Sequence, residues 1–165
     1  KFERSERTLK ELNYIAHVAY EKKEYVKLSK VIEKCETLLA LSNKGIKVIL
    51  VNDCGFYCDK TQLESVIITL FLNSQNNFIA SEKSEPTIEI KEKSGELTFS
   101  DNGAGFSEDI LKGLQDGRYT PANRESGLGL YMVGNLVKRM GGQVSYSNSA
   151  QGALIKLKLP KTKVS

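Results

Sequence analysis

The sequence is poor in cysteine and histidine and has no long apolar run, and each shortage excludes a class of protein. Its three cysteines are an odd number with no secretory signal, which favours a reducing compartment over a disulfide framework. Cys54 and Cys58 could begin a metal site, but no second pair or nearby histidine completes the four ligands of a structural zinc. No apolar run reaches the roughly 18 residues that cross a membrane. We therefore expect a cytoplasmic chain, whose full-length protein can still carry a membrane anchor.

The composition is that of one globular domain. The chain has 165 residues, 40% of them apolar and 27% charged, so it can bury a core without disulfides or a structural metal. The net charge of +4 is spread along the chain, with lysines near both ends, and this gives no support to nucleic-acid binding. Because the first residue is lysine rather than methionine, we expect a piece of a longer protein.

Hydrophobic spacing predicts helix in the first quarter of the chain. Residues 2–42 lack glycine and proline, and they have two helical apolar patterns separated by a charged break or joint at 21–25. A stop is expected at 43–45 and a strand at 46–50. Asp59 should then cap a helix that runs to about Ala80.

The second half of the chain predicts strands in pairs. Residues 87–91 and 96–100 should form a hairpin through Ser94-Gly95, and 143–147 and 153–159 should form another pair after a helix over 127–140. Strand pairs beside helices favour an α+β fold over a doubly wound parallel one. We expect a two-layer α/β sandwich with a mixed, mainly antiparallel sheet, preceded by an N-terminal helix.

A glycine-rich segment, Asp101-Asn102-Gly103-Ala104-Gly105, follows a predicted strand. Glycines two residues apart let the backbone turn sharply and approach a ligand closely. The carboxylate of Asp101 could accept a hydrogen bond from an exocyclic amine such as that of adenine. The alternative is an ordinary turn, because Asp-Asn-Gly is common turn chemistry.

A second glycine motif, Ser126-Gly127-Leu128-Gly129-Leu130, opens a predicted helix. Free N–H groups and the helix dipole make such a start a phosphate site. The motif is not a P-loop, because the lysine and the Ser/Thr are missing, and its glycine spacing is not that of a Rossmann fingerprint. The alternative is a helix whose small residues permit close packing.

Asn73 lies inside the predicted helix 63-LESVIITLFLNSQNNFIA-80, with Asn76 and Asn77 one turn further on. An amide oxygen is a hard ligand and can coordinate Mg²⁺ bound to phosphates. Alone, an asparagine within a helix is more often a capping or core hydrogen-bonding residue. The interpretation of Asn73 as a metal ligand therefore depends on the two glycine motifs that follow it in the chain.

These three motifs, in this order, resemble the N, G1 and G2 boxes of the GHKL superfamily, which includes histidine kinases, Hsp90, MutL and type II topoisomerases. The resemblance covers about residues 24–160. Residues 24–50 look like the entry helix and first strand of the ATP-binding catalytic domain of sensor histidine kinases, and 141-GGQVSYSN-148 and 152-GALIKLKLP-160 look like its ending. Residues 1–22 would then be the end of a dimerisation-type helix or linker, and 23–162 the catalytic domain.

The resemblance implies a Bergerat ATP-binding fold with ATP and Mg²⁺ as ligands. Asp101 would bind the adenine amine, Asn73 would bind Mg²⁺, and residues 106–125 would be a lid, since long glycine-containing connections are often mobile. The glycines of the two motifs would shape the adenine pocket and admit the phosphates. The expected nucleotide-binding residues are Asn73, Asn76, Asn77, Asp101, Gly103, Gly105, Leu114, Arg118, Tyr119, Ser126, Gly127, Leu128 and Gly129.

Thr69 decides between kinase and ATPase. The ATP-hydrolysing branches place a glutamate at this position, one turn before Asn73, and threonine cannot replace it as a base near neutral pH. Kinases usually carry asparagine there, so Thr69 departs from their pattern too. Asn76 stands where many kinases have a basic residue, and the lid lacks the usual phenylalanine-rich box. Arg118 or Arg124 could supply the missing positive charge.

His17 is the only histidine, and it lacks the acidic and proline residues that follow the family's phosphoacceptor. We interpret it as a surface or packing residue, so the expected acceptor lies upstream in the full protein or on another protein. The leading hypothesis is transfer of the γ-phosphate of ATP to that histidine in two-component signalling, with a response regulator and a homodimer as partners. The alternatives are a GHKL ATPase or anti-sigma-type serine kinase, and a non-catalytic module derived from the fold.

Overall fold

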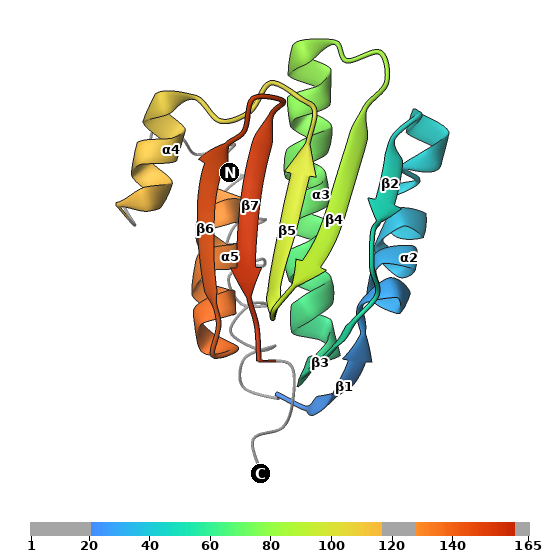
Figure 1. The fold of residues 1–165 in the computed structure, drawn as a ribbon, viewed down its shortest axis with the longest axis vertical. Helices are drawn as coiled ribbons and strands as arrows, with labels where there is room; N and C mark the ends of the chain where they lie inside the picture. The colour runs from blue at the N-terminus through green and yellow to red at the C-terminus, as the bar shows by residue number, and fades with distance from the viewer. Residues whose placement is uncertain (1–20, 117–127, 161–165) are drawn as a thin grey trace, which may run out of the picture.

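The computed structural model describes residues 21–116 and 128–160, which form a sheet with helices packed on one side (Figure 1). The helices α2, α3 and α5 all lie behind the sheet in this view, and α4 lies beyond the outer strand β6. In chain order the elements are β1 (Lys23–Lys27), α2 (Leu28–Leu39), a 3₁₀ turn (Ser42–Lys44), β2 (Lys47–Leu50), β3 (Gly55–Asp59), α3 (Lys60–Ser81), β4 (Thr87–Lys93), β5 (Glu96–Asp101), α4 (Glu108–Gln115), α5 (Leu128–Arg139), β6 (Gln143–Asn148) and β7 (Ala153–Lys158).

The main sheet has five strands in the order β2-β4-β5-β7-β6. The pair β2 and β4 is parallel, and the other neighbouring pairs are antiparallel. The hairpin between β4 and β5 turns at Ser94 and Gly95, both with positive φ, as a tight turn between antiparallel strands requires. The predicted sandwich with a mixed, mainly antiparallel sheet is confirmed.

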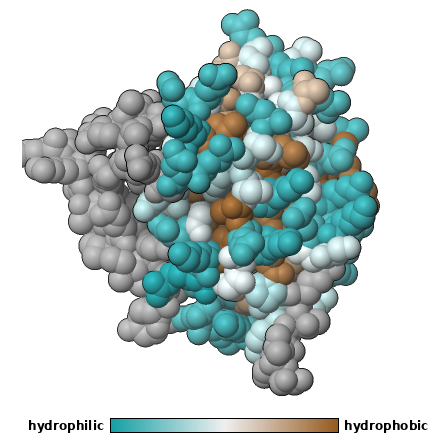
Figure 2. Space-filling model, turned by 60° about the vertical axis from the view of Figure 1, so that its left-hand side comes forward, coloured by the Kyte–Doolittle hydropathy of each residue, from teal (hydrophilic) through white to brown (hydrophobic). Residues whose placement is uncertain are grey.

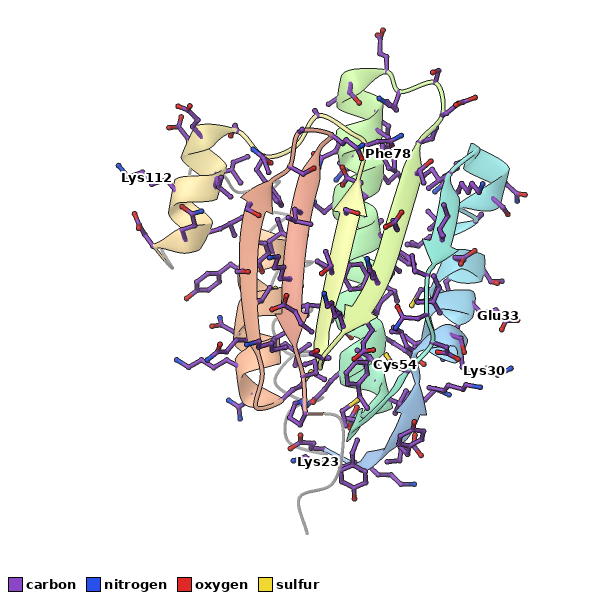
Figure 3. The ribbon with its side chains drawn as sticks, in the orientation of Figure 1. Lys23, Lys30, Glu33, Cys54, Phe78 and Lys112 are labelled. Carbon is purple, nitrogen blue, oxygen red and sulfur yellow. The ribbon has the colours of Figure 1, made fainter. Side chains whose placement is uncertain are left out.

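The three central strands, β4, β5 and β7, alternate between buried residues and more exposed ones. On β5, Leu97 and Phe99 are buried while Thr98 and Ser100 between them are partly exposed, so one face of the sheet meets the helices and the other meets water. Hydrophilic residues cover most of the described surface in the side view, with smaller apolar areas between them (Figure 2). The charged side chains of Lys30, Glu33 and Lys112 point outward from their helices, whereas Phe78 lies near the end of β5 (Figure 3).

The charged segment near residue 23 is a strand, and its interpretation as part of a helix or a helix joint was wrong. Lys23–Lys27 pairs antiparallel with Gly55–Asp59, a strand that periodicity also missed, and the two form a small second sheet. Only Val26 of the first strand is buried, which leaves no alternation to detect. The exposed Tyr25 ring lies over Gly55, where an added Cβ would collide with it.

The helix that follows also ends earlier than predicted. It stops at Leu39, because Ala40 takes a left-handed conformation with φ of 50° and its N–H bonds back to the last turn. The segment expected to be helical up to residue 42 thus includes a Schellman-like stop. Leu41, fully buried, follows that stop and joins the core.

The start of α3 is fixed by the buried Asp59, as predicted. One carboxylate oxygen accepts a 3.0 Å hydrogen bond from the N–H of Gln62, which is N-capping geometry. The other oxygen accepts a 2.8 Å hydrogen bond from the N–H of Lys22, on the segment that leads into β1. A single side chain therefore holds both the first turn of the longest helix and the chain at the edge of the described domain.

The stretch after Phe106 contains a helix that the sequence did not predict. Ser107 caps α4 by accepting a hydrogen bond from Ile110, and two acidic residues occupy the first turn, which favours the helix start electrostatically. The segment 106–125 expected to be a lid thus contains a helix at 108–115, its role as a lid stays a prediction, and its part over 117–125 lies outside the described residues. The predicted helix over 127–140 is seen as α5, which ends before Gly141 with φ of 84°. Among the described residues, no helix is long and apolar enough to cross a membrane.

Candidate functional site

The site is centred on the carboxylate of Asp101, which ends β5 and is 6% exposed. Its Oδ2 accepts a 2.8 Å hydrogen bond from the hydroxyl of Ser74 on α3. Its Oδ1 accepts hydrogen bonds from the backbone N–H of Gly103 at 3.0 Å and of Ala153 at 3.3 Å. Donors from α3, from the following loop and from β7 thus hold this buried carboxylate in one orientation, as a hydrogen-bond acceptor.

Two asparagines fix the loop that follows Asp101. The side chain of Asn102 accepts a hydrogen bond from Thr87 N–H at 2.8 Å and donates one to the carbonyl of Glu85 at 2.9 Å. At the far end, the Asn148 amide accepts from the N–H and donates to the carbonyl of Phe106, both at 2.8 Å. Side chains thus satisfy both backbone groups of Phe106, and Asn102 attaches the start of the loop to the chain before β4.

Three glycines allow this loop to pack tightly against its neighbours. A Cβ on Gly103 would lie 3.0 Å from Cβ of Asn77, and one on Gly105, whose φ is 77°, would lie 2.9 Å from Oδ1 of Asn148. A Cβ on Gly152 would collide with the carbonyl oxygen of Asp101 and lie 2.8 Å from its Oδ1. The close contacts are with the protein itself, and the direct role of these glycines toward a ligand stays a prediction.

Asn73 and Asn77 stand one turn apart on α3, on either side of the turn that carries Ser74. Both are partly buried, and the Nδ2 atom of each is buried without a hydrogen-bond partner in the described part of the chain. An unsatisfied buried amide costs about 1–3 kcal/mol, so these two amides are candidates for contact with a ligand. A half-turn of the side chain exchanges the amide oxygen and nitrogen, and either atom can face that ligand.

The start of α5 lies beside the same part of α3. A Cβ on Gly129 would be 3.1 Å from the methyl carbon of Thr69, and Thr69 lies one turn, about 6 Å, before Asn73 along the helix. The close contact permits α5 to approach α3, which is the packing role that the sequence left open. It also places the N–H groups at the start of α5, which a helix cannot satisfy internally, beside Thr69, one turn before Asn73.

The side chains of the site are compatible with a Mg²⁺ ion whose ligands come mainly from the phosphates of a nucleotide. Within 21–116 and 128–160, no three His, Cys, Asp or Glu side chains are grouped as a metal cage. Mg²⁺ in nucleotide sites keeps several waters and takes one or two protein ligands together with phosphate oxygens. The amide of Asn73 can be such a ligand.

The structure brings together only part of the predicted set. Asn77, Asp101 and Gly103 lie together, with Gly105 in the same loop, and Asn73 lies one turn before Asn77 on α3. Gly129 lies on the adjacent helix, beside Thr69. Asn76 is exposed on α3, and Leu114 is partly buried against the core on α4, so their contact with a nucleotide stays a prediction. The predictions for Arg118, Tyr119, Ser126, Gly127 and the Leu128 side chain, and those for His17 and Arg124, lie outside the described residues.

Sequence reasoning missed three residues that shape the site. Ser74 bonds the central carboxylate, Asn148 holds the loop, and Gly152 lets β7 start against Asp101. Ser74 directly follows Asn73, and that position was the available signal. The other two lie in the segments near the end of the chain that carried the family resemblance, but nothing local marked them as parts of a site.

The sequence of the chain is similar to that of known proteins. Residues 58–163 match the family described as histidine kinase-, DNA gyrase B- and HSP90-like ATPase. A putative sensor histidine kinase NtrY-like of Rickettsia conorii is 31% identical over 111 residues, which are 66% of this chain and 18% of that protein. The sensor protein FixL of Bradyrhizobium diazoefficiens is 25% identical over 142 residues, which are 81% of this chain and 28% of that protein. The chain thus spans between about a fifth and about a third of the length of these relatives.

Solved structures share the fold. The histidine kinase AdeS of Acinetobacter baumannii has a TM-score of 0.69 at 20% identity, with 98% of this chain and 81% of that chain covered. The ATP binding domain of PrrB from Mycobacterium tuberculosis has a TM-score of 0.63 at 20% identity, with 86% and 98% covered. At this identity the likeness establishes the fold, and the chemistry must be argued from the residues of the site.

Proposed function

We propose, since the chain belongs to the family of histidine kinase-, DNA gyrase B- and HSP90-like ATPases, that residues 23–162 are the cytoplasmic ATP-binding catalytic domain of a sensor histidine kinase. In this proposal, residues 1–22 are the end of a dimerisation-type helix or linker. The observation that supports it is the buried Asp101, held as an acceptor by Ser74 of α3, the helix that also carries the unsatisfied amides of Asn73 and Asn77. A nucleotide offers the matching groups: an amine on the base, and phosphates with their metal.

Each part of ATP has a complementary group in the site. Asp101 accepts a hydrogen bond from the adenine amine, and the fixed loop after it forms the wall of the adenine pocket. Asn73 holds Mg²⁺, which when bound neutralises charge on the phosphate oxygens. The N–H groups at the start of α5 face the phosphates, where the helix dipole favours negative charge.

The surroundings of Thr69 favour transfer to an imidazole over hydrolysis. Its hydroxyl donates a 2.8 Å hydrogen bond to the carbonyl of Ser65 on its own helix, and its methyl carbon faces Gly129. A threonine hydroxyl is far too weak a base to take a proton from water near neutral pH. Phosphoryl transfer depends chiefly on positioning and electrostatics, and a histidine needs no such base because its imidazole is already a nucleophile.

The partners follow from this chemistry. The phosphoacceptor is a histidine domain upstream in the full-length protein, which we propose to be a homodimer. A response regulator is the final acceptor of the phosphate. No nucleic acid takes part.

Two measurements on the isolated chain and the full-length protein test the proposal. Calorimetry with a non-hydrolysable ATP analogue should give binding that is stronger with Mg²⁺ than without it. With γ-labelled ATP, the isolated chain should stay unlabelled and hydrolyse little, while the full-length protein should form an acid-labile phosphohistidine. Absence of binding would favour a non-catalytic module, and rapid hydrolysis lost in Thr69→Ala would favour an ATPase. Transfer to a serine of another protein would favour an anti-sigma-type kinase.

A further inference from the structure

Ser74 has a hydrogen-bonding arrangement that a core serine does not need. It lies on the inner face of α3, is 6% exposed, and its hydroxyl reaches across 27 positions of sequence to Oδ2 of Asp101 at 2.8 Å. Serines within helices commonly bond the carbonyl four residues back, as Ser65 does with Thr61. Ser74 instead gives its proton to the one buried carboxylate of the site.

The lone pairs of Asp101 can be counted. An ionised carboxylate has about four acceptor positions. In the described structure Oδ1 accepts from Gly103 and Ala153, which fills its two positions, and Oδ2 accepts from Ser74, which fills one. One position is left for a ligand, and it is on the oxygen that Ser74 holds.

The hydroxyl of Ser74 is itself left with lone pairs only. A serine has one O–H to donate, and here that proton is engaged with a carboxylate. A charge-assisted hydrogen bond of this kind is stronger than a neutral one, so the hydroxyl does not turn its proton elsewhere without a cost. The Ser74 proton is used between Oγ and Oδ2, so these two oxygens offer only lone pairs to a ligand.

We propose that Ser74 is a specificity-determining residue, which orients Asp101 and makes the pair select a purine with an amino group at position 6 over one with an oxo group. This rests on the proposed function, because it assumes that the base of a nucleotide lies against Asp101. A 6-amino group donates to the free position on Oδ2. A 6-oxo group would direct its lone pairs at those of the protein, and such mismatches are discriminated strongly because buried polar groups stay unpaired.

Three triphosphates separate this role from a merely structural one. ATP carries the 6-amino group, inosine triphosphate carries a 6-oxo group, and purine riboside triphosphate carries only hydrogen there. Their affinities are measured by calorimetry with Mg²⁺ for the parent chain, for Ser74→Ala, and for the matched control Ser65→Ala, which removes a hydroxyl bonded only to its own helix. Thermal unfolding of each variant is recorded alongside.

We expect Ser74→Ala to weaken ATP about tenfold, by loss of the orientation of a charged acceptor, and to change purine riboside triphosphate by less than about twofold. The preference for ATP over inosine triphosphate should shrink by a similar factor, and Ser65→Ala should leave all three affinities unchanged. Equal losses for ATP and the 6-hydrogen analogue, or none, would overturn the role of Ser74. If Ser74→Ala does not fold, the affinities of the parent chain still test the proposal. Equal affinity of the parent chain for ATP and inosine triphosphate would contradict it. Failure of the parent chain to bind ATP at all would instead contradict the proposed function.

Discussion

The side-chain amide of Asn148 forms two 2.8 Å hydrogen bonds with the backbone of Phe106, accepting from its N–H and donating to its carbonyl. Asn148 ends β6, and Phe106 closes the glycine loop that begins at Asp101. The Phe106 ring, 8% exposed, packs edge-on against Tyr146 with 6.1 Å between ring centroids. Phe106 thus attaches the loop to β6 in two ways, through its backbone to Asn148 and through its ring to Tyr146.

Replacing Asn148 by alanine should loosen this loop and weaken ATP binding. The variant Asn148→Ala removes both hydrogen bonds to Phe106, so part of the loop's order must be supplied when the nucleotide binds. We expect affinity to fall about 3- to 10-fold, because two hydrogen bonds of roughly 1 kcal/mol each are lost. Calorimetry with a non-hydrolysable ATP analogue measures the change.

Asn52 offers a matched control, because it makes the same kind of contact at the other edge of the sheet. Its side chain accepts from the N–H of Glu92 at 2.9 Å and donates to the carbonyl of Glu92 at 2.8 Å. Asn52→Ala should lower the melting temperature as Asn148→Ala does, yet leave ATP affinity unchanged. Equal weakening of ATP binding in both variants would show that general stability, and not the loop, is responsible.

Changing Asp101 to asparagine should damage the site more severely. Three donors point at this carboxylate, from Ser74, Gly103 and Ala153, and an amide puts its own N–H₂ group against at least one of them. A hydrogen bond to a charged group is worth about 1.5–3 kcal/mol, so we expect ATP affinity to fall about 10- to 100-fold. A fluorescent ATP analogue displaced by ATP can measure this, and parent-like affinity would mean that the base lies elsewhere.

Two glycine-to-alanine changes should shift stability in opposite directions. At Gly152 the new Cβ collides with the Asp101 carbonyl, and overpacking of this kind costs about 1–3 kcal/mol. At Gly134, inside α5, the new Cβ lies 3.7 Å from Val144 and 3.9 Å from Tyr146, which is ordinary contact. Because glycine within a helix costs about 0.5–1 kcal/mol relative to alanine, Gly134→Ala should stabilise the protein. Urea unfolding gives both values, and a neutral Gly152→Ala would show that β7 can move away from the site.

Stability should fall in alkali because of two buried thiols. Burial raises the pKa of Cys35 from 9.0 to about 11 and that of Cys58 to about 12. Above pH 9 the unfolded chain releases thiol protons that the folded chain keeps, so the free energy of unfolding decreases as pH rises, while below pH 9 these groups have no effect. At pH 10, each thiol should lower the free energy of unfolding by about 1 kcal/mol relative to its value below pH 9.

Urea unfolding between pH 8 and pH 10.5 measures this slope. The variant Cys35→Ala should start from lower stability, because it creates a cavity, yet lose less stability per pH unit than the parent. An unchanged slope would show that Cys35 ionises as readily in the folded protein as in the unfolded one.

The parts of the fold that the sequence predicted well are those with local signals. The hairpin through Ser94-Gly95 and the cap at Asp59 each depend on residues close together in the chain. The small sheet could not be found in this way, since Val26 pairs with Phe56 thirty positions later and its own strand has no alternation. The helix α4 was missed because eight residues give little more than two turns of periodicity.

The site shows the same division. Asp101 and Asn73 were predicted as site residues because they stand in motifs with a recognisable order along the chain. The contribution of Ser74 is a matter of where its proton goes, and that depends on a carboxylate brought to it by the packing of α3 against β5. No spacing in the sequence encodes the direction of a hydroxyl.

Asp59 has a mechanical consequence. Its carboxylate ties the N–H of Lys22 to the first turn of α3, and α3 is the rigid rod that carries Thr69, Asn73 and Ser74. A displacement of the chain at Lys22 would therefore strain or break a hydrogen bond to the side chain that caps the helix carrying the candidate site.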